Sequence, residues 1–301
     1  MIAEEKRRAR NLPEMGAIMM RMFGPDDARL SIESWKPRPT DIVITPFGKC
    51  GTTWLQQTFH TLRTRGDMDF DDISRVVPWI ETSVGLGVDL EAPQRAAPRG
   101  FKSHLAFDML PPGARAVVAF RDPRDAMVSM YRFFEGWFFE PGAIGIHDFA
   151  AARMGGSPGS RDYWEHLISW WAQRDNPDVL LFSYEGMVAD PEGSIRRLAA
   201  FCDIPLDDDL LALTLERSSI DFMLAHKDKY SDVMMREHSE ARCNLPPGSD
   251  SAKVRKGVVG GHVKELPPET AALLDARWAE TVEPATGFKD YASFEAAVRA
   301  L

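Results

Sequence analysis

Short apolar runs alternate along this chain with longer segments in which apolar residues recur at helical spacing. Residues 42–44 and 116–120 are entirely apolar and residues 179–184 are nearly so, which is typical of strands buried on both faces. A shorter strand is predicted at 100–104. Because helical segments separate these runs, we predict an α/β fold in which a parallel sheet is flanked by helices on both faces.

A polar or charged side chain stands at or just beyond the end of each predicted strand. Lys49, His104, Arg121 and Tyr184 occupy these positions. The carboxyl ends of parallel strands meet at one edge of a sheet, and ligands bind beyond that edge. We therefore expect these four side chains to surround one site.

The first candidate site is the turn after the first strand. This turn contains Gly48, Lys49 and Gly51, and Thr52 and Thr53 then begin a helix. The first N–H groups of a helix have no partner within it, so together with a lysine and two hydroxyls they can bind a phosphate-like anion. This P-loop-like order predicts a nucleotide ligand. The alternative is that the two glycines only form a turn before a buried helix.

A second anion site is predicted around Arg121. Asp122 suits the N-cap position of the following helix and Pro123 its first residue, which places Ser129 in the second helical turn. An arginine and a hydroxyl held in this way can bind a phosphate. The alternative is that Arg121 forms an ion pair with Asp122 or Asp125 at the helix start.

A third cationic element lies far downstream, at Arg255-Lys256-Gly257. Two adjacent cations beside a flexible glycine suit a lid over a phosphate, whereas a basic pair taken alone is typical of a solvated surface. The three cationic turns together predict a ligand that carries phosphates at both ends of a nucleoside.

Composition narrows the class of protein without assigning a reaction. The 301 residues are 44% hydrophobic and 27% charged, with no long linker and no internal repeat, which predicts one globular domain. The net charge of -9 argues against a general nucleic-acid binder. The three cysteines form no disulfide framework or zinc pattern, no segment is long enough to span a membrane, and the N-terminus has no sustained apolar leader. We expect a cytoplasmic protein that binds neither nucleic acid nor membrane and needs no metal.

The first loop resembles the 5′-phosphosulfate loop of the cytosolic sulfotransferases, which is usually P-K-S-G-T-T-W. The matching stretch here is Lys49-Cys50-Gly51-Thr52-Thr53-Trp54. It departs from the family pattern in two ways: Phe47-Gly48 separates Pro46 from the lysine, and a cysteine replaces the serine. The other two turns resemble the family's R-[DN]-P-[RK]-D-x-x-V-S and R-K-G-x-x-G segments. The likeness covers residues 38–262 of a single sulfotransferase domain, and leaves 1–37 as an N-terminal helical extension and 263–301 as a C-terminal tail.

The resemblance implies 3′-phosphoadenosine 5′-phosphosulfate as the co-substrate and adenosine 3′,5′-bisphosphate as its product. It places Tyr184 and Trp54 near the base, and Ser218 and Met223 around the purine, with Ile220 in the position of the family's stacking phenylalanine. For Tyr184 and Trp54 the alternative is simple burial in the core. The residues assigned to the donor in this way are Lys49, Cys50, Gly51, Thr52, Thr53, Trp54, Arg121, Ser129, Tyr184, Ser218, Met223, Arg255, Lys256 and Gly257.

Lys102 and His104 carry the predicted chemistry. Alternation along a strand places both side chains on one face. A neutral imidazole can take the proton of a hydroxyl near pH 7, which contributes roughly 10²–10⁴-fold to a rate. The stretch resembles the family's K-T-H-L-P segment, which implies His104 as the general base and Lys102 as an aid to sulfuryl transfer. Lys49 is expected to stabilise the charge that grows on the oxygen bridging to the 5′-phosphate.

The acceptor is expected to be a small, largely apolar molecule that bears a hydroxyl, such as a phenol or an alcohol. Residues 77–81 resemble the family's V-P-F-L-E stretch beside the acceptor, and residues 131–139 are dense in aromatic rings. We predict acceptor contacts from Trp79, Glu81, Phe133 and Trp137. The alternatives are that these rings belong to the core and that Glu81 caps a helix.

Two other classes of function share some of these features. A P-loop kinase-like phosphotransferase should show G-K-[ST] and a magnesium-binding carboxylate after an apolar strand, where this chain has Arg121. A non-catalytic protein that binds adenosine bisphosphate would not need Lys102 and His104. The oligomeric state stays open, because the family's dimer motif K-x-x-x-T-V-x-x-x-E is not found after Lys264.

Overall fold

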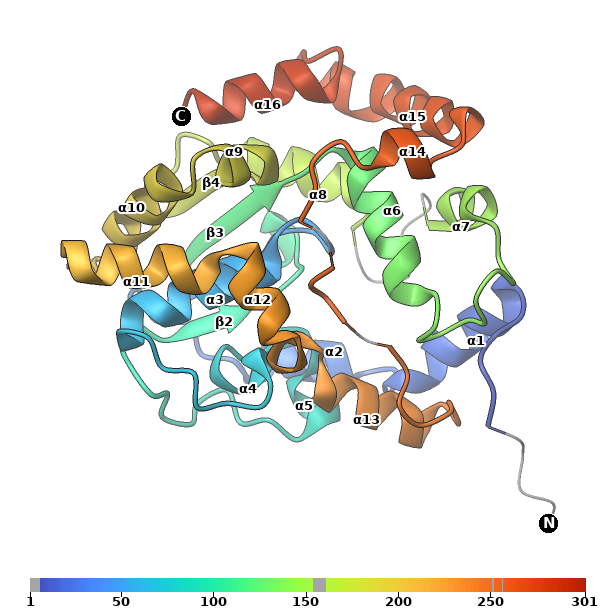
Figure 1. The fold of residues 1–301 in the computed structure, drawn as a ribbon, viewed down its shortest axis with the longest axis horizontal. Coiled ribbons are helices and arrows are strands. Elements are labelled where there is room, and N and C mark those ends of the chain that lie inside the picture. Colours follow the sequence, from blue (N-terminus) through green and yellow to red (C-terminus); the bar gives the residue numbers. More distant parts are fainter. Residues whose placement is uncertain (1–5, 154–160, 251, 256) are drawn as a thin grey trace.

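The computed structural model describes residues 6–153, 161–250, 252–255 and 257–301, and at its centre lies a four-stranded sheet (Figure 1). The strands are β1 (Ile42–Ile44), β2 (Gly100–Lys102), β3 (Arg115–Phe120) and β4 (Val179–Ser183), in the order β2-β1-β3-β4. All three strand pairings are parallel, so the predicted parallel sheet is confirmed. The chain leaves β1 for one side of the sheet and then returns to the other, so the strand order reverses beside β1, where ligands bind in such sheets.

Helices cover both faces of this sheet, as predicted. The helices are α1 (Leu12–Met22), α2 (Asp27–Ser34), α3 (Thr52–Thr64), α4 (Ile73–Val76), α5 (Ser83–Leu86), α6 (Pro123–Phe134), α7 (Ile146–Arg153), α8 (Tyr163–Trp171), α9 (Tyr184–Ala189), α10 (Pro191–Phe201), α11 (Asp208–Ser218), α12 (Ile220–Ala225), α13 (Val233–Arg242), α14 (His262–Glu265), α15 (Pro268–Thr286) and α16 (Tyr291–Arg299), with 3₁₀ turns η1 (Ile80–Thr82), η2 (Phe107–Met109) and η3 (Lys227–Tyr230). None of the helices in the described ranges is both long enough and apolar enough to cross a membrane.

Alternate residues of the strands pack in two separate hydrophobic cores, one on each face of the sheet. Val117 packs with Leu55 and Phe59 of α3 on one face, and its neighbour Val118 packs with Trp170 on the other. This alternation follows from the two-residue period of a strand. Because residues at successive positions of the strand are apolar, both faces of the sheet can be buried. The second core also contains Trp278, Phe294 and other buried residues of α15 and α16, so the C-terminal segment, predicted only as a tail, covers part of one face of the sheet (Figure 1).

Two of the strands end earlier than the sequence predicts. β2 ends at Lys102, because the Ser103 hydroxyl accepts a hydrogen bond from Leu105 N and the chain turns there. β4 ends at Ser183, whose hydroxyl accepts from Gly186 N and so caps α9. His104 and Tyr184 therefore lie one or two residues beyond their strands. The helix start at Asp122 and Pro123 is confirmed, since Asp122 accepts from Arg124 N.

Candidate active site

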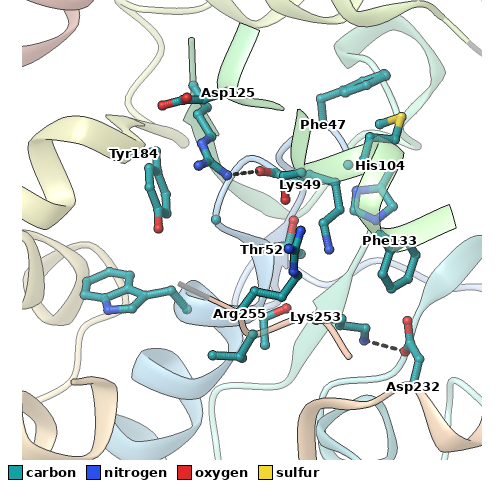
Figure 2. Close-up of a pocket in the computed structure, with 18 of the residues that line it drawn as sticks. Phe47, Lys49, Thr52, His104, Asp125, Phe133, Tyr184, Asp232, Lys253 and Arg255 are labelled. Atoms are coloured by element: carbon teal, nitrogen blue, oxygen red, sulfur yellow. Dashed lines mark hydrogen bonds and ion pairs between the residues drawn. The ribbon is translucent and has the colours of Figure 1, made fainter. Parts of the chain in front are cut away.

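A single cavity of about 800 Å³ brings together the predicted residues from the four strand ends and the downstream segments. It is lined by eighteen of the predicted site residues: Lys49, Gly51, Thr52, Thr53, Trp54, Trp79, Glu81, Lys102, His104, Arg121, Ser129, Phe133, Trp137, Tyr184, Ser218, Met223, Arg255 and Gly257. Cys50 is buried and does not line the cavity, and Lys256 lies outside the described residues. Figure 2 shows Tyr184 on one side of the cavity and His104 and Phe133 on the other.

The loop after β1 has a backbone shape that depends on glycine. Gly51 precedes α3 with a φ of 96°, and a Cβ added there would lie 2.9 Å from Met187 Cε and 3.1 Å from the Tyr184 ring. Because glycine has no side chain, it cannot cap the start of α3. The first N–H groups of α3 therefore stay available to a ligand. The Thr52 hydroxyl is buried and has no hydrogen-bond partner among the described residues. These groups fit an anion at the start of α3.

The Lys49 ammonium lies inside the cavity, 4.0 Å from the centre of the Phe133 ring. Burial, and next the charge of Lys253, lower the pKa of Lys49 to about 7. Among the described residues no carboxylate forms an ion pair with Lys49. Its ammonium lies against an aromatic ring, and the charge of Asp232 offsets only part of the effect of burial on its pKa. A bound anion would therefore favour the protonated form.

Cys50, which was predicted to contact the cofactor, has a buried side chain. Its sulfur lies 3.8 Å from the Gly48 carbonyl oxygen, and burial raises the pKa of the thiol to about 12. The thiol is protonated at neutral pH, which disfavours a covalent route through this residue. Only the backbone of Cys50 is left to contribute to the loop.

Arg121 connects the first loop to the third cationic turn. One of its Nη groups donates to Lys49 O at 3.0 Å, and the other donates to Val258 O at 3.3 Å. Its guanidinium lies 4.3 Å from the centre of the Tyr184 ring, and its Nε is buried without a hydrogen-bond partner in the described part of the chain. No carboxylate of those residues pairs with Arg121, so the alternative of an ion pair with Asp122 or Asp125 is wrong.

Both of those carboxylates have other partners. Asp122 forms an ion pair with Arg124 at 2.8 Å. Asp125 accepts hydrogen bonds from the backbone N–H of Gly260, at 2.7 Å, and from that of His262, at 2.9 Å. The sequence did not identify this role of Asp125, which holds the downstream segment against α6. Arg255 and Gly257 of that segment line the cavity, and the Arg255 side chain is exposed to solvent.

The base-binding residues of the prediction lie on the Tyr184 side. Trp54 Nε1 donates to Ser218 O at 3.0 Å, and the Ser218 hydroxyl donates to Thr214 O within α11. Trp54 is half-buried and Met223 is 3% exposed. The Ser218 hydroxyl is therefore already engaged, and its carbonyl oxygen fixes the tryptophan ring.

His104 lies on the opposite side, held by two hydrogen bonds. Its Nδ1 lies 2.6 Å from Pro46 O, and its backbone N donates to Glu81 Oε1 at 2.6 Å. Because a carbonyl oxygen can only accept, Nδ1 carries the hydrogen and Nε2 of the neutral ring carries the lone pair. Burial, followed by the charge of Lys102, lowers the pKa of His104 to about 3. The imidazole is therefore neutral at physiological pH.

Residues 78–81 lie beside the end of β2 and support the side of the cavity that holds His104. Lys102 N donates to Pro78 O at 2.8 Å, and the Lys102 ammonium lies 3.6 Å from the centre of the Trp79 ring. Burial lowers the pKa of Lys102 to about 8. Glu81 was predicted to contact the acceptor or cap a helix, but its Oε1 holds the backbone of His104 while its Oε2 is buried without a partner among the described residues.

The predicted aromatic wall is present and α1 extends it. Phe133 lies under Lys49, and Trp137 is buried with its Nε1 donating to Ser239 Oγ at 2.9 Å. Met19 and Met22 of α1 also line the cavity. The N-terminal extension was not expected to contribute, although the apolar side of its helical pattern was a signal for burial against the core.

Two charged residues at the cavity were missed entirely. Lys253 and Asp232 form an ion pair, with side chains that are 7% and 4% exposed (Figure 2). Burial opposes ionisation of Asp232, but the charges of Lys102 and Lys253 lower its pKa to about 2. Lys253 could have been noticed as a cation two residues before Arg255. Asp232 carries no local signal.

No group of three or more His, Cys, Asp and Glu side chains in the described ranges is arranged to hold a metal ion.

Comparison with known proteins places most of the chain in one family, and the match extends past residue 262 into the segment predicted as a tail. Residues 39–284 match the family model of the sulfotransferase domain. Sulfotransferase 1 family member D1 of Rattus norvegicus is 28% identical over 240 residues, which cover 76% of this chain and 79% of that protein. Sulfotransferase 1B1 of Mus musculus is 28% identical over 244 residues, with 76% and 78% covered.

Solved structures show the same fold. Retinol dehydratase, in complex with androsterone and the inactive cofactor PAP, has a TM-score of 0.70 at 20% identity, with 92% of this chain and 95% of that chain covered. Mouse sulfotransferase SULT7A1, complexed with PAP, has a TM-score of 0.64 at 21% identity, with 85% and 90% covered.

Proposed function

Because the chain belongs to the sulfotransferase family, we propose that it moves a sulfuryl group from 3′-phosphoadenosine 5′-phosphosulfate to a hydroxyl of a small, largely apolar acceptor. The observation that carries this proposal is the single cavity in which the Lys49 loop, Arg121 and His104 meet. The presence of PAP in two structures of the same fold supports the choice of donor. We also propose that residues 1–301 act as one domain, since α1 lines the cavity and α15 and α16 complete a core.

The unpaired polar groups of the cavity fit a nucleotide with phosphates at both ends. Thr52 Oγ1 and Arg121 Nε are buried without partners among the described residues, and the ammonium groups of Lys49 and Lys102 rest on ring faces. Leaving such groups without partners costs roughly 1–3 kcal/mol each, which an anionic ligand would recover. The loop at residues 49–53 would hold the 5′ end.

The 3′-phosphate would lie at Arg121, Ser129 and Arg255, with Tyr184 and Trp54 beside the base. When bound, the donor supplies the sulfuryl group and a phosphate leaving group. Lys256, the other predicted cation of the lid, keeps its predicted role in binding that phosphate.

His104 is proposed as the general base. With Nδ1 donating to Pro46 O, Nε2 can accept the proton of the acceptor hydroxyl. With a pKa of about 3, His104 is a weak base in the free protein. Negative charge placed beside Lys49 and Lys102 would raise the pKa of His104 toward neutral pH. Glu81 keeps the imidazole in place through the backbone of His104.

Lys49 and Lys102 are proposed to stabilise the negative charge that develops during transfer. Their ammonium groups are preplaced in a cavity with apolar and aromatic walls, where electrostatic stabilisation is stronger than in water. The same negative charge would raise the pKa values of both lysines above those of the free protein and keep them protonated.

One comparison of wild type with His104→Ala tests this function. Release of adenosine 3′,5′-bisphosphate from the sulfated donor is measured with a panel of phenols. We expect turnover by the wild type and a loss of roughly 10²-fold or more in the variant, with the bisphosphate still bound. Tight bisphosphate binding with no turnover in the wild type would favour a non-catalytic binding protein.

The kinase-like alternative is tested by thermal stability. A sulfotransferase should be stabilised by adenosine 3′,5′-bisphosphate more than by ATP with magnesium, because ligand binding to the native state alone raises the unfolding temperature. The reverse order would favour a phosphotransferase. Arg121 at the end of β3, where such an enzyme needs a carboxylate for magnesium, supports the first outcome.

A further inference from the structure

The ion pair between Lys253 and Asp232 has no role in the donor site described above. The Lys253 nitrogen is buried, and apart from this ion pair it has no hydrogen-bond partner in the described part of the chain. An ammonium group has three N–H donors, so Asp232 leaves it with unused capacity. Asp232 also accepts a hydrogen bond from Ser74 Oγ at 3.3 Å, which fixes the carboxylate from a second element.

The pair faces the acceptor half of the cavity. Both residues line the cavity, and Figure 2 shows them on the same side as His104 and Phe133, across from Tyr184. Of the charged groups, Lys253 does most to lower the pKa of Lys49, and Asp232 does most to raise that of Lys102. Lys253 therefore lies among the groups proposed to carry out the transfer.

The charge balance of the cavity favours an anionic ligand at this point. The other lining carboxylates have roles within the fold: Asp125 holds the downstream segment, Asp162 caps α8, Glu265 pairs with Arg132, and Glu81 holds the backbone of His104. Burial raises the pKa of Glu81, which disfavours its negative charge. Asp232 is the carboxylate that does most to raise the pKa of Lys49 and of Lys102, and it is already engaged by Lys253 and Ser74. The cations are less well satisfied, since among the described residues neither Lys49 nor Lys102 forms an ion pair with a carboxylate, and each ammonium lies against an aromatic ring.

We infer that the acceptor carries an anionic group in addition to its hydroxyl, and that Lys253 binds this group while Asp232 fixes the ammonium. This inference rests on the proposed sulfuryl transfer and names its substrate class: an aromatic or other apolar hydroxy compound with a carboxylate or similar acid. The aromatic and methionine walls contact the apolar body, and the unused N–H donors of Lys253 form a charge-assisted hydrogen bond with the acid. Lys253 is then a specificity-determining residue.

The test compares three phenols of similar size that differ in charge. Binding of para-hydroxyphenylpropionate, para-propylphenol and tyramine to the wild-type protein saturated with adenosine 3′,5′-bisphosphate is measured by titration calorimetry, and kcat/KM is measured for each with the sulfated donor. The carboxylate should bind about tenfold or more tightly than the neutral phenol, and the cationic amine should bind most weakly.

Variants of the ion pair test whether it causes the preference for the carboxylate over the neutral phenol. Removing one partner of a buried pair can unfold a protein, so the double variant Lys253→Met with Asp232→Asn removes both charges together. In the double variant, the ratio of the neutral to the carboxylate dissociation constant should fall to about one. Asp232→Asn alone should keep the preference for the carboxylate. Lys289→Met changes an exposed lysine that does not line the cavity and should leave the ratio unchanged.

Two results would overturn the inference alone. One is equal binding of the carboxylate and the neutral phenol by the wild type, with bisphosphate binding intact. The other is tightest binding of tyramine, lost in Asp232→Asn, which would assign Asp232 as the recognition group for a cationic acceptor. Absence of bisphosphate binding, or of turnover with every acceptor, would instead overturn the proposed function and the inference together.

Discussion

Binding of adenosine 3′,5′-bisphosphate should take up protons at alkaline pH. The pKa of Lys49 is lowered to about 7 by burial and by the neighbouring Lys253, and that of Lys102 to about 8 by burial. At pH 8 about nine-tenths of the Lys49 side chains and about half of the Lys102 side chains are therefore neutral in the free protein. An anionic ligand beside these amines raises both pKa values, so the complex recovers the missing protons.

The sign and size follow from linkage. Both amines gain protons on binding above pH 7, so affinity should fall as the pH rises, by roughly 25-fold per unit near pH 8. Lys49 alone accounts for an uptake of about 0.9 proton at that pH. Below pH 6 both lysines are already charged in the free protein, so their contribution disappears.

Titration calorimetry in buffers of different ionisation enthalpy measures this uptake directly. At pH 8 the observed enthalpy should depend on the buffer ionisation enthalpy with a slope of about 1.4 protons, and Lys49→Met should lower this slope to about 0.5. Phosphate protons do not interfere, because the second phosphate pKa is near 6. A slope of zero in the wild type would show that both lysines are charged in the free protein and that their burial does not act as argued here.

Three further outcomes are expected. His104→Gln should lower kcat by roughly 10²–10⁴-fold, while the bisphosphate dissociation constant changes by less than about threefold. A single-turnover rate that falls by less than about tenfold would exclude a base role. Gly51→Ala should lower the free energy of unfolding by roughly 1–3 kcal/mol, because its φ is 96° and its Cβ would lie 2.9 Å from Met187 Cε. The control Gly16→Ala adds a methyl group where no atom lies within 4 Å, and equal urea midpoints for the two variants would contradict the steric argument. Cys50, with a thiol pKa of about 12, should stay unmodified by iodoacetamide at pH 8 until urea unfolds the protein, as read by mass spectrometry, whereas rapid labelling of the native protein would contradict its burial.

The sequence predicted the elements that depend on near neighbours. Apolar runs located three of the four strands, and the Asp122-Pro123 pair located the start of α6, because caps and strand periodicity are properties of adjacent residues. The short strand β2 was also predicted, although its sequence is not an apolar run. Strand ends were less accurate, since a local serine hydroxyl stopped β4 at Ser183 and started α9. The roles assigned to individual donor and acceptor residues remain predictions.

Contacts between distant segments could not be read from the sequence. Asp232 meets Lys253, Glu81 holds the backbone of His104, and Asp125 binds the backbone of Gly260, each through residues far apart in the chain. The residues next to each of these carboxylates in the sequence do not indicate its partner. Their partners are set by how the sheet and its helices pack.

The sequence by itself determined the α/β fold, the position of the site at the strand ends and the family of the chain, because these depend on local periodicity and on short contiguous motifs. Only the tertiary structure decided the ionisation of the site. Desolvation and the distances between buried charges lower the pKa of Lys49 to about 7 and that of His104 to about 3. Both effects arise when segments distant in the chain enclose the same cavity and exclude water from it.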